Sequence, residues 1–237
     1  MKKIKKLIAA MVLIPGIVLA GTPVETLVPV EHIYSPKGFD SNDNAEIIIE
    51  GFLPNLCHKS PMTEYKVIGR KIEIKVKALK YDASNPYCPE VIVPFVESVN
   101  VGMLDKGLYD IVVNGKSIYQ KGSSIFVNES ISNSVDEHVY ANVEYVEKFS
   151  GSREINLKGY NPSECFVIDE VQFVDNGKDT YSVLPKMKQV SDFCPMKMIP
   201  FSIKAEVPNK LIREKVLLHV RVMGGNSVNS IFSNPKL

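Results

Sequence analysis

The feature that most constrains this fold is a short sequence motif, here called the repeated phrase, that occurs twice in the chain. Gly51 to Cys57 reads GFLPNLC and Gly159 to Cys165 reads GYNPSEC, so both segments follow the pattern G-[FY]-x-P-x-x-C. Further short matches keep the same order in the two halves of the chain: Glu31-His32-Ile33-Tyr34 with Glu137-His138-Val139-Tyr140, Glu46-Ile47 with Glu154-Ile155, Cys88-Pro89-x4-Pro94-Phe95 with Cys194-Pro195-x4-Pro200-Phe201, and Ser124-Ile125-Phe126 with Ser230-Ile231-Phe232. Ordered matches at a nearly fixed spacing indicate an internal duplication.

The spacing of the duplication sets the size of the repeating unit. All of the matches lie 106 to 108 residues apart. This is the length of a small independent domain, and it is too long for one repeat of a solenoid. The run Ser130-Ile131-Ser132-Asn133-Ser134 is short, polar and rich in turn formers, so we place the boundary there. The sequence therefore predicts two domains, residues 21–132 and 133–237.

Each predicted domain holds one pair of cysteines. Because the pairs repeat with their domains, the simplest connectivity is Cys57–Cys88 and Cys165–Cys194. Closing a loop of about 30 residues stabilises a domain by roughly 3–4 kcal/mol in the chain-entropy model. The alternatives are metal ligands, which Cys57-His58 would suggest, or free thiols. The second copy has no histidine at the position that matches His58, which favours the disulfides.

The first twenty residues have the pattern of a cleaved signal peptide. Lys2, Lys3, Lys5 and Lys6 form a basic start, residues 7–19 are apolar, and Val18-Leu19-Ala20 supplies small or modest side chains before the expected cleavage site. A membrane anchor is the alternative, but the apolar stretch is shorter than the roughly 20 residues that a span requires. We therefore expect a leader at residues 1–20 and a secreted chain, either periplasmic or extracellular.

The net charge of the chain restricts the classes of partner that it can bind. Without the leader, 24 Lys and Arg face 27 Asp and Glu, a net charge of about −3. Binding to nucleic acid needs a basic face that releases counterions, so we expect no nucleic-acid partner. No segment after the leader is apolar over the length of a transmembrane helix, so no membrane span is expected in the mature chain. An oxidising compartment outside the cytoplasm is consistent with the paired cysteines.

The periodicity of the chain is that of β-strands. Residues 71–78 read KIEIKVKA, in which apolar and charged side chains alternate, as in a strand with one buried and one solvated face. A turn at Gly69-Arg70 joins this strand to a strand at 64–68, and the segment Asp175-Asn176-Gly177-Lys178 predicts a hairpin at the matching place. Each half offers about seven such strands and no helical stripe. The predicted fold class is all-β, with two tandem antiparallel β-sandwiches.

One local motif resembles a known superfamily. Asp105-x-Gly107-x-Tyr109 is similar to the D-x-G-x-Y-x-C "tyrosine corner" of immunoglobulin-like β-sandwiches. The resemblance implies that the Tyr109 hydroxyl donates to backbone a few residues upstream. The sequence departs from the family because Ile111 replaces its second cysteine, and because the chain has no Trp. The resemblance covers seven residues, and it implies a fold but no activity.

No group of residues predicts catalysis. The sequence lacks G-x-S-x-G, HExxH, Walker A and dinucleotide-binding motifs. His32 and His138 match across the repeat, and duplication favours a structural role for both. The carboxylates of Glu144 and Glu147 are interpreted as surface charge. We therefore predict no catalytic, cofactor-binding or metal-ligating residues, no cofactor and no enzymatic activity.

Two segments have alternative interpretations. Met196 and Met198 lie near Cys194 and would suit soft Cu(I), but the first copy has Ile92 in place of Met198, so we interpret the methionines as core. Prolines bracket Val91-Ile92-Val93 and its copy, which predicts a strand that is short or at a sheet edge. Such an edge is either protected against aggregation or open to a partner peptide.

These observations favour an exported, non-enzymatic binding or structural module of the cell envelope or the extracellular space. Its partner would be a protein or another envelope component that the sequence does not identify. The alternative is a secreted protease inhibitor that presents a disulfide-anchored loop, such as Leu53-Pro54-Asn55-Leu56 or Ser84-Asn85-Pro86-Tyr87. A third hypothesis is an enzyme with a polar site between the two domains.

Overall fold

The computed structural model describes residues 22–81, 87–132, 136, 138–177, 179–208 and 214–234. Every helix or strand assigned within these ranges is a β-strand, and none of their segments is a helix long and apolar enough to cross a membrane. The expected leader (1–20), Ser84-Asn85-Pro86 of one proposed inhibitory loop, Asn133-Ser134 of the expected boundary and Lys178 of the expected hairpin lie outside the described residues.

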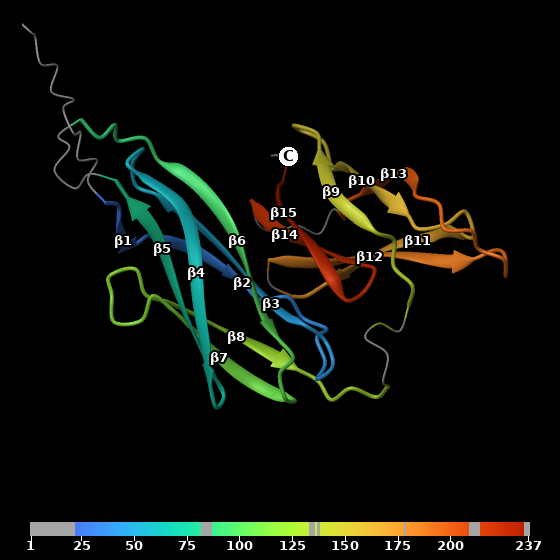
Figure 1. Cartoon of the computed structure of the whole chain (residues 1–237), viewed down its shortest axis with the longest axis horizontal. Helices are drawn as coiled ribbons and strands as arrows, with labels where there is room; N and C mark the ends of the chain where they lie inside the picture. The colour runs from blue at the N-terminus through green and yellow to red at the C-terminus, as the bar shows by residue number, and fades with distance from the viewer. Residues whose placement is uncertain are drawn as a thin grey trace, which may run out of the picture.

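The strands fall into two groups, one in each half of the chain (Figure 1). The first group is β1 (Val24–Leu27), β2 (Val30–Tyr34), β3 (Ala45–Leu53), β4 (His58–Ile68), β5 (Lys71–Lys80), β6 (Val93–Gly102), β7 (Gly107–Val113) and β8 (Lys121–Val127). The second group is β9 (Val143–Lys148), β10 (Glu154–Asn161), β11 (Phe166–Asp175), β12 (Thr180–Gln189), β13 (Ile199–Glu206), β14 (Lys215–Val222) and β15 (Asn226–Ser233).

Each group forms a sandwich of two sheets. In the first sandwich, β2-β3-β6 is one sheet, and β5 joins β4, β1 and β7-β8 in the other. In the second sandwich, β9-β10-β13 faces β11-β12-β14-β15. Each sandwich encloses its own apolar core. The predicted fold class, two all-β sandwiches with one disulfide each, is confirmed.

The sandwiches share one feature that strand periodicity did not predict. Most neighbouring strands pair antiparallel, but β5 pairs parallel with β7, and β12 pairs parallel with β14. Lys71 lies opposite Asp110 in the first pair, and Thr180 lies opposite Leu217 in the second. Alternating side chains report which face is buried but not which neighbour a strand has, so the parallel pairing was not visible in the sequence.

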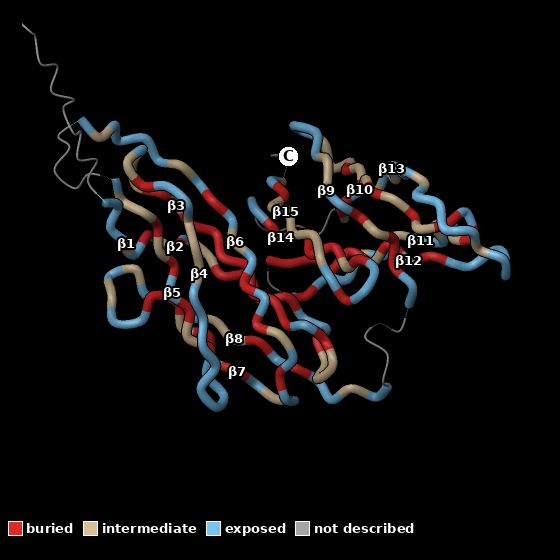
Figure 2. Tube along the Cα trace, viewed as in Figure 1, coloured by how far each residue is buried: buried red, intermediate tan, exposed pale blue. Residues whose placement is uncertain are grey.

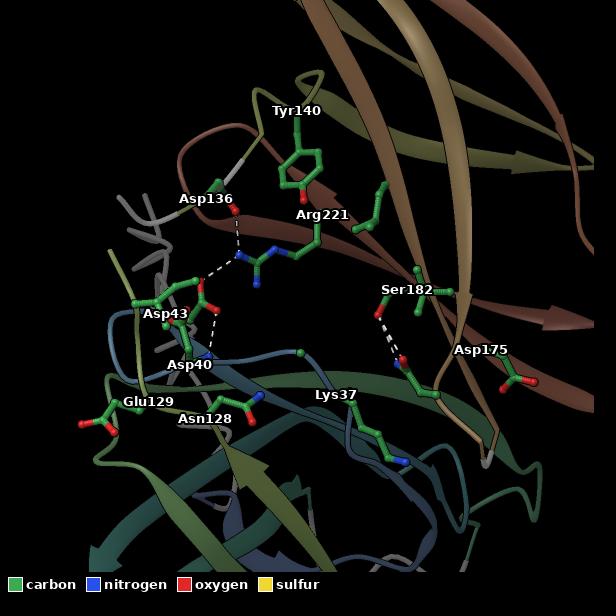
Figure 3. A pocket seen from close by; sticks show the side chains of 15 residues that line it. Lys37, Asp40, Asp43, Asn128, Glu129, Asp136, Tyr140, Asp175, Ser182 and Arg221 are labelled. Atoms are coloured by element: carbon green, nitrogen blue, oxygen red, sulfur yellow. Dashed lines mark hydrogen bonds and ion pairs between the residues drawn. The ribbon is translucent and has the colours of Figure 1, made fainter. Parts of the chain in front are cut away.

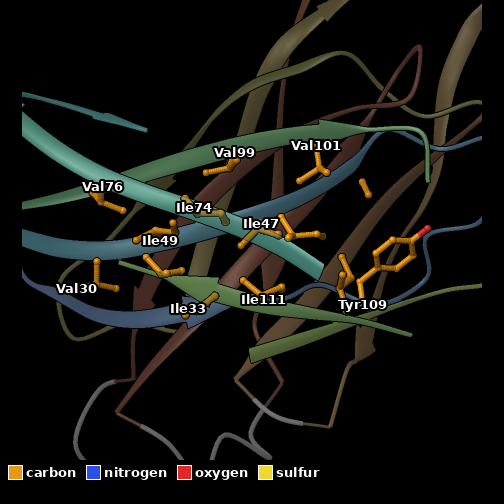
Figure 4. Close-up of a cluster of buried hydrophobic side chains, with 14 of the residues drawn as sticks. Val30, Ile33, Ile47, Ile49, Ile74, Val76, Val99, Val101, Tyr109 and Ile111 are labelled. Atoms are coloured by element: carbon orange, nitrogen blue, oxygen red, sulfur yellow. The ribbon is translucent and has the colours of Figure 1, made fainter. Parts of the chain in front are cut away.

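The alternation in β5 works as predicted. Ile72, Ile74, Val76 and Ala78 all point into the core of the first sandwich, where Ile47 and Ile49 of β3 meet them (Figure 4). The side chains between them carry charge and lie at the surface. Two strands break this rule, because β3 and β14 are buried on both faces (Figure 2).

The repeated phrase marks a close approach of backbones. A Cβ on Gly51 would lie 2.5 Å from the carbonyl oxygen of Pro29, and one on Gly159 would lie 2.0 Å from that of Asn142. Real side chains do not tolerate such distances, so glycine is required at both positions. Phe95 lies opposite Gly51 on β6, and Phe201 lies opposite Gly159 on β13. The glycine of the repeated phrase is therefore a site of close backbone approach in both sandwiches.

Two of the five sequence matches do not correspond in space. Tyr34 lies in β2 opposite Ile48, whereas Tyr140 forms a bridge with Lys186 of β12. The Ser-Ile-Phe match is displaced by one residue, because Ile125 lies opposite Tyr109 and Phe232 lies opposite Val216. The treatment of His32 and His138 as equivalent residues was therefore wrong. The matches around the cysteines keep their register in both sandwiches.

The strands after the second cysteines are sheet edges, as predicted, but they are not short. β6 begins at Val93 and runs for 10 residues, and β13 begins at Ile199 and runs for 8. Each is the last strand of its three-stranded sheet. Pro94 and Pro200 lie inside these strands, where a missing N–H is tolerated at an edge.

The tyrosine-corner resemblance is borne out at its key contact. The Tyr109 hydroxyl donates to the carbonyl oxygen of Asp105 at 3.0 Å. The ring itself is buried in the core of the first sandwich. This bond closes the connection between β6 and β7 in the way that the resemblance implied.

Candidate functional site

The two sandwiches meet along a contact that we call the seam. It joins the outer face of the β2-β3-β6 sheet to strands β14 and β15. Its centre is apolar, because Tyr34, Ile48 and Leu217 form one buried cluster with Ile231 packed against it. Successive residues of a strand point to opposite faces, so Leu217 faces the seam while Leu218 faces the core of the second sandwich. The seam explains why β3 and β14 are buried on both faces.

Arg221 ties the two sandwiches together at one end of the seam. Its Nη2 donates to Asp43 at 2.8 Å and to Asp136 at 2.7 Å (Figure 3). Asp136 also accepts from the backbone N–H of Gly225 at 3.1 Å. Although burial works against its charge, hydrogen bonds to Asp136 and Asp43 raise the pKa of Arg221 above its ordinary value. The guanidinium lies over the ring of Phe39, 5.9 Å from its centre.

Further ion pairs cross the seam beside its apolar centre. The Glu50 carboxylate accepts from the Tyr34 hydroxyl at 2.9 Å and from Lys215 of the second sandwich. The hydrogen bond with Glu50 raises the pKa of Lys215. His32 pairs with Asp179 of the second sandwich. The Glu50–Lys215 and His32–Asp179 contacts fix one relative position of the sandwiches, because each joins a side chain of one sandwich to a side chain of the other.

Glu46 and His219 are both buried in the seam and lie close to each other. Glu46 accepts from the Ser227 hydroxyl and from Asn229 Nδ2, the latter at 3.0 Å. Asn229 Oδ1 lies 2.9 Å from His219 Nδ1, and Glu46 Oε2 lies 3.7 Å from the same nitrogen. Burial lowers the pKa of His219, so the imidazole is neutral at neutral pH. His219 Nε2 is buried without a hydrogen-bond partner among the described residues.

Two hollows lie along the seam. The seam groove has a volume of about 570 Å³ and lies between Lys37, Tyr140 and Asp175, with Arg221 in its wall (Figure 3). The seam cavity, of about 330 Å³, is smaller and more enclosed. The side chains and backbone that line the seam cavity come from Phe39, Asn44, Glu46, Asn100, His219, Arg221, Gly225, Asn226 and Ser227.

An exposed aromatic residue directly precedes the second cysteine of each disulfide. The bonds Cys57–Cys88 and Cys165–Cys194 are present, as predicted. The residue before each second cysteine is aromatic and faces solvent, since Tyr87 is 85% exposed and Phe193 is 83% exposed. A proline follows each second cysteine. We call Tyr87-Cys88-Pro89 and Phe193-Cys194-Pro195 the aromatic turns.

Two apolar residues that follow each aromatic turn within a few positions are also exposed. Met196 is 94% exposed and Met198 is 68% exposed. Val91 and Ile92 are exposed at the corresponding place in the first sandwich. The interpretation of Met196 and Met198 as core residues was therefore wrong. A matching Ile in the other copy indicates a shared apolar surface here rather than a shared core.

The remaining residues that the sequence singled out have structural or surface positions. Asn55 Oδ1 lies 2.7 Å from His58 Nδ1 and also accepts from the backbone of Cys57, which closes the loop after β3. Burial and then the charge of Lys80 lower the pKa of His58. His138 is exposed, and Glu147 pairs with a lysine of the neighbouring strand at the surface. Among the described residues, no three His, Cys, Asp or Glu lie together as a metal site would require.

Sequence reasoning missed the seam. Asp43, Glu50, Asp136 and Arg221 belong to no motif, and Glu46 was noted only as part of a repeat match. The available signal was the composition of β3, AEIIIEGFL, and of β14, KVLLHVRV, in which apolar residues occupy consecutive positions. Such runs are typical of strands that are covered on both faces. This pattern would have indicated a covered outer face, although not the surface that covers it.

Comparisons with known proteins support the fold of the first sandwich. Residues 47–122 match the family model of the ORF11 beta-sandwich domain. The match runs from β3 into β8 and includes both cysteines of the first disulfide. No curated protein and no solved structure matches the chain. The fold and the family match thus define a β-sandwich protein with one disulfide in each half.

Proposed function

We propose that this protein is an exported, non-enzymatic binding module of the cell envelope or the extracellular space. Its aromatic turns would be the elements that contact a protein partner. The sequence of the leader and the two disulfides support export, because disulfides persist in oxidising compartments. The Tyr109 contact supports a relationship with immunoglobulin-like domains, which this proposal does not require.

The observation that carries the proposal is the exposure of Tyr87 and Phe193 at equivalent places in both sandwiches. Aromatic side chains are costly to leave in water and are enriched at the centres of protein interfaces. A disulfide restrains each turn, so little conformational entropy would be lost on binding. Exposed apolar neighbours extend each turn into a patch, as expected for a contact with another protein.

The seam gives the two turns a fixed relation to each other. In Figure 1 the first turn precedes β6 and the second precedes β13, so the turns lie toward opposite ends of the molecule. A rigid body with one apolar turn at each end suits a module that bridges two partner surfaces. A flexible tether between the sandwiches would lack this geometry.

Site-specific photocrosslinking tests the proposal. A photoreactive phenylalanine would replace Tyr87, Phe193 or, as a control, Phe126, which is an exposed aromatic on β8 away from both turns. The chain would be expressed in intact cells that export it. We expect a defined crosslinked product from positions 87 and 193 and none from position 126. Equal crosslinking from all three positions, or none from the turns, would overturn the proposal.

The protease-inhibitor alternative rests on loops beside the first disulfide, namely Leu53-Pro54-Asn55-Leu56 and Ser84-Asn85-Pro86-Tyr87, of which Tyr87 belongs to an aromatic turn. An inhibitor also presents an exposed side chain on a restrained loop. In the first loop, Leu56 is exposed beside Cys57, and the Asn55 side chain holds the backbone that precedes it. A panel of serine, cysteine and metalloproteases at micromolar protein distinguishes the two functions. Inhibition that is lost in Leu56→Gly or Phe193→Gly would favour the inhibitor, and its absence would favour the binding module.

The absence of enzymatic activity is part of the proposal and has its own test. Glu50 pairs with Lys215 and Asp43 pairs with Arg221 across the two sandwiches, which favours a structural role for these charges. A screen with ester, peptide, glycoside and phosphate substrates should show no turnover above buffer. Turnover that one substitution in the seam groove abolishes would show that the hollow between the sandwiches is an active site.

A further inference from the structure

The seam cavity is surrounded by more negative than positive charge. Glu46 is buried and accepts hydrogen bonds from Ser227 and Asn229, but no Lys or Arg of the described residues pairs with it. Arg221 also lines the cavity, yet its charge is opposed by two carboxylates, Asp43 and Asp136. A buried carboxylate without a cationic partner is costly, so the cavity favours the entry of a cation.

The hydrogen bonds determine the proton position on His219. Asn229 Nδ2 donates to Glu46, so its amide oxygen is the atom that faces His219 Nδ1. An oxygen can only accept, so Nδ1 carries the hydrogen. Nε2 of the neutral ring is then an acceptor, and no donor of the described residues reaches it. His219 therefore brings to the lining of the cavity an imidazole whose acceptor nitrogen lacks a donor among the described residues.

We propose that the seam cavity binds a small primary ammonium compound. Its volume of about 330 Å³ lies at the lower end of the range for small-molecule sites. An ammonium group has three donors and no acceptor, and the cavity offers the carboxylate of Glu46 and the side-chain oxygens of asparagines. The ring of Phe39 also lines the cavity and can pack against the methylene groups of the ligand.

The arrangement fits an ammonium group better than a metal ion. Glu46 lies 3.7 Å from Nδ1 of His219, which carries the hydrogen, and not beside the unpartnered Nε2. The carboxylate and the available imidazole nitrogen therefore do not form a chelating pair. No third His, Cys, Asp or Glu of the described residues completes a metal site with them. An ammonium group needs only separate acceptors, and the cavity has these.

Calorimetric titration of the purified chain, with both sandwiches present, tests this inference. The probes are ethanolamine and 1,4-diaminobutane, and the neutral controls are ethylene glycol and 1,4-butanediol. We expect saturable binding of the amines and none of the diols. Glu46→Gln should weaken amine binding by at least about tenfold, since it removes a charge-assisted hydrogen bond. Glu50→Gln is the matched control on the same face of β3, and it should bind within about twofold of the native chain.

Nuclear magnetic resonance of the imidazoles supplies a second readout that needs no variant. Addition of ethanolamine should shift the Nε2 resonance of His219 and leave those of His58 and His138 unchanged. The inference is overturned if no amine binds saturably, if amines and diols bind equally, if Glu46→Gln binds as the native chain does, or if the His219 resonance does not move. A negative result would not contradict the proposed binding function of the aromatic turns, because these turns lie outside the seam.

Discussion

Leucine 217 offers the sharpest test of the seam, because its neighbour on the strand is a natural control. Leu217 and Leu218 are the same residue type and both are completely buried. Leu217 packs against Tyr34 and Ile48 of the first sandwich, whereas Leu218 packs in the core of the second. Substituting each by alanine removes the same atoms from two different contacts.

The expected loss of free energy is similar for the two variants, but the two variants weaken different contacts. Replacing a fully buried leucine by alanine costs about 2–5 kcal/mol. In Leu217→Ala this cost falls on the contact between the sandwiches, so the equilibrium for opening the seam should rise by roughly 30-fold or more. In Leu218→Ala the cost falls on the folding of the second sandwich, and the seam keeps its contacts.

Hydroxyl-radical footprinting measures the difference on the first sandwich, which neither variant changes. Tyr34 is buried in the seam and Tyr109 is buried in the core of the first sandwich. Under conditions in which both variants are folded, Leu217→Ala should increase the oxidation of Tyr34 and not of Tyr109. Leu218→Ala should change neither. Unchanged oxidation of Tyr34 in Leu217→Ala, or an equal increase in both variants, would refute the assignment of Leu217 to the seam.

Four further predictions concern stability in urea unfolding. Gly159→Ala should cost about 3 kcal/mol or more, because its Cβ would lie 2.0 Å from the backbone oxygen of Asn142. Gly151→Ala, at φ 71° with open space around it, should cost only about 1–2 kcal/mol. Equal costs would contradict the close approach. Asn114→Ala should cost about 1–3 kcal/mol for each backbone group that it leaves without a partner, since its side chain accepts from Val76 N–H and donates to the carbonyl of Val28; a neutral effect would show that these bonds are dispensable. Removing Cys57–Cys88 should destabilise the first sandwich by about 2–4 kcal/mol and leave the second unchanged in hydrogen exchange. Burial lowers the pKa of His219, so below about pH 6.5 the unfolded chain takes up a proton that the folded chain does not. The free energy of unfolding should therefore be constant above about pH 6.5 and decrease as the pH falls below it, and this decrease should be less steep in His219→Gln. An identical pH dependence in the variant would show that His219 is not its cause.

Features that depend on local chemistry could be predicted from the sequence. The alternation of Ile72 and Ile74 with charged residues predicted a strand with one buried face, and the fold has that strand. Cysteines copied with their domains predicted the two disulfides. The repeated phrase has a glycine at the same point of both domains, and the carbonyls of Pro29 and Asn142 are the groups that require it.

Features that depend on contacts between distant strands could not be predicted. The parallel pairing of β5 with β7 leaves no mark on either strand. Short sequence matches that do not lie next to a cysteine did not identify equivalent positions in the two sandwiches, as the different positions of Tyr34 and Tyr140 show. Met196 was misassigned for a similar reason, because the sequence alone does not show whether an apolar side chain lies in the core or at the surface.

The seam itself was invisible for a related reason. Asp43 and Arg221 lie 178 residues apart in the chain, and the sequence around either residue does not indicate that they pair. Long-range polar contacts of this kind depend on how two finished domains pack, and that packing is not encoded in any one segment.

The central claim is that the seam holds the two sandwiches as one rigid body. The ¹⁵N relaxation of backbone amides tests this most directly, because it reports the rotational correlation time of each sandwich separately. We predict one common correlation time for amides of β3, in the first sandwich, and of β12, in the second, which corresponds to tumbling of the whole chain. Two shorter and different correlation times would mean that the sandwiches move independently, and would contradict the seam.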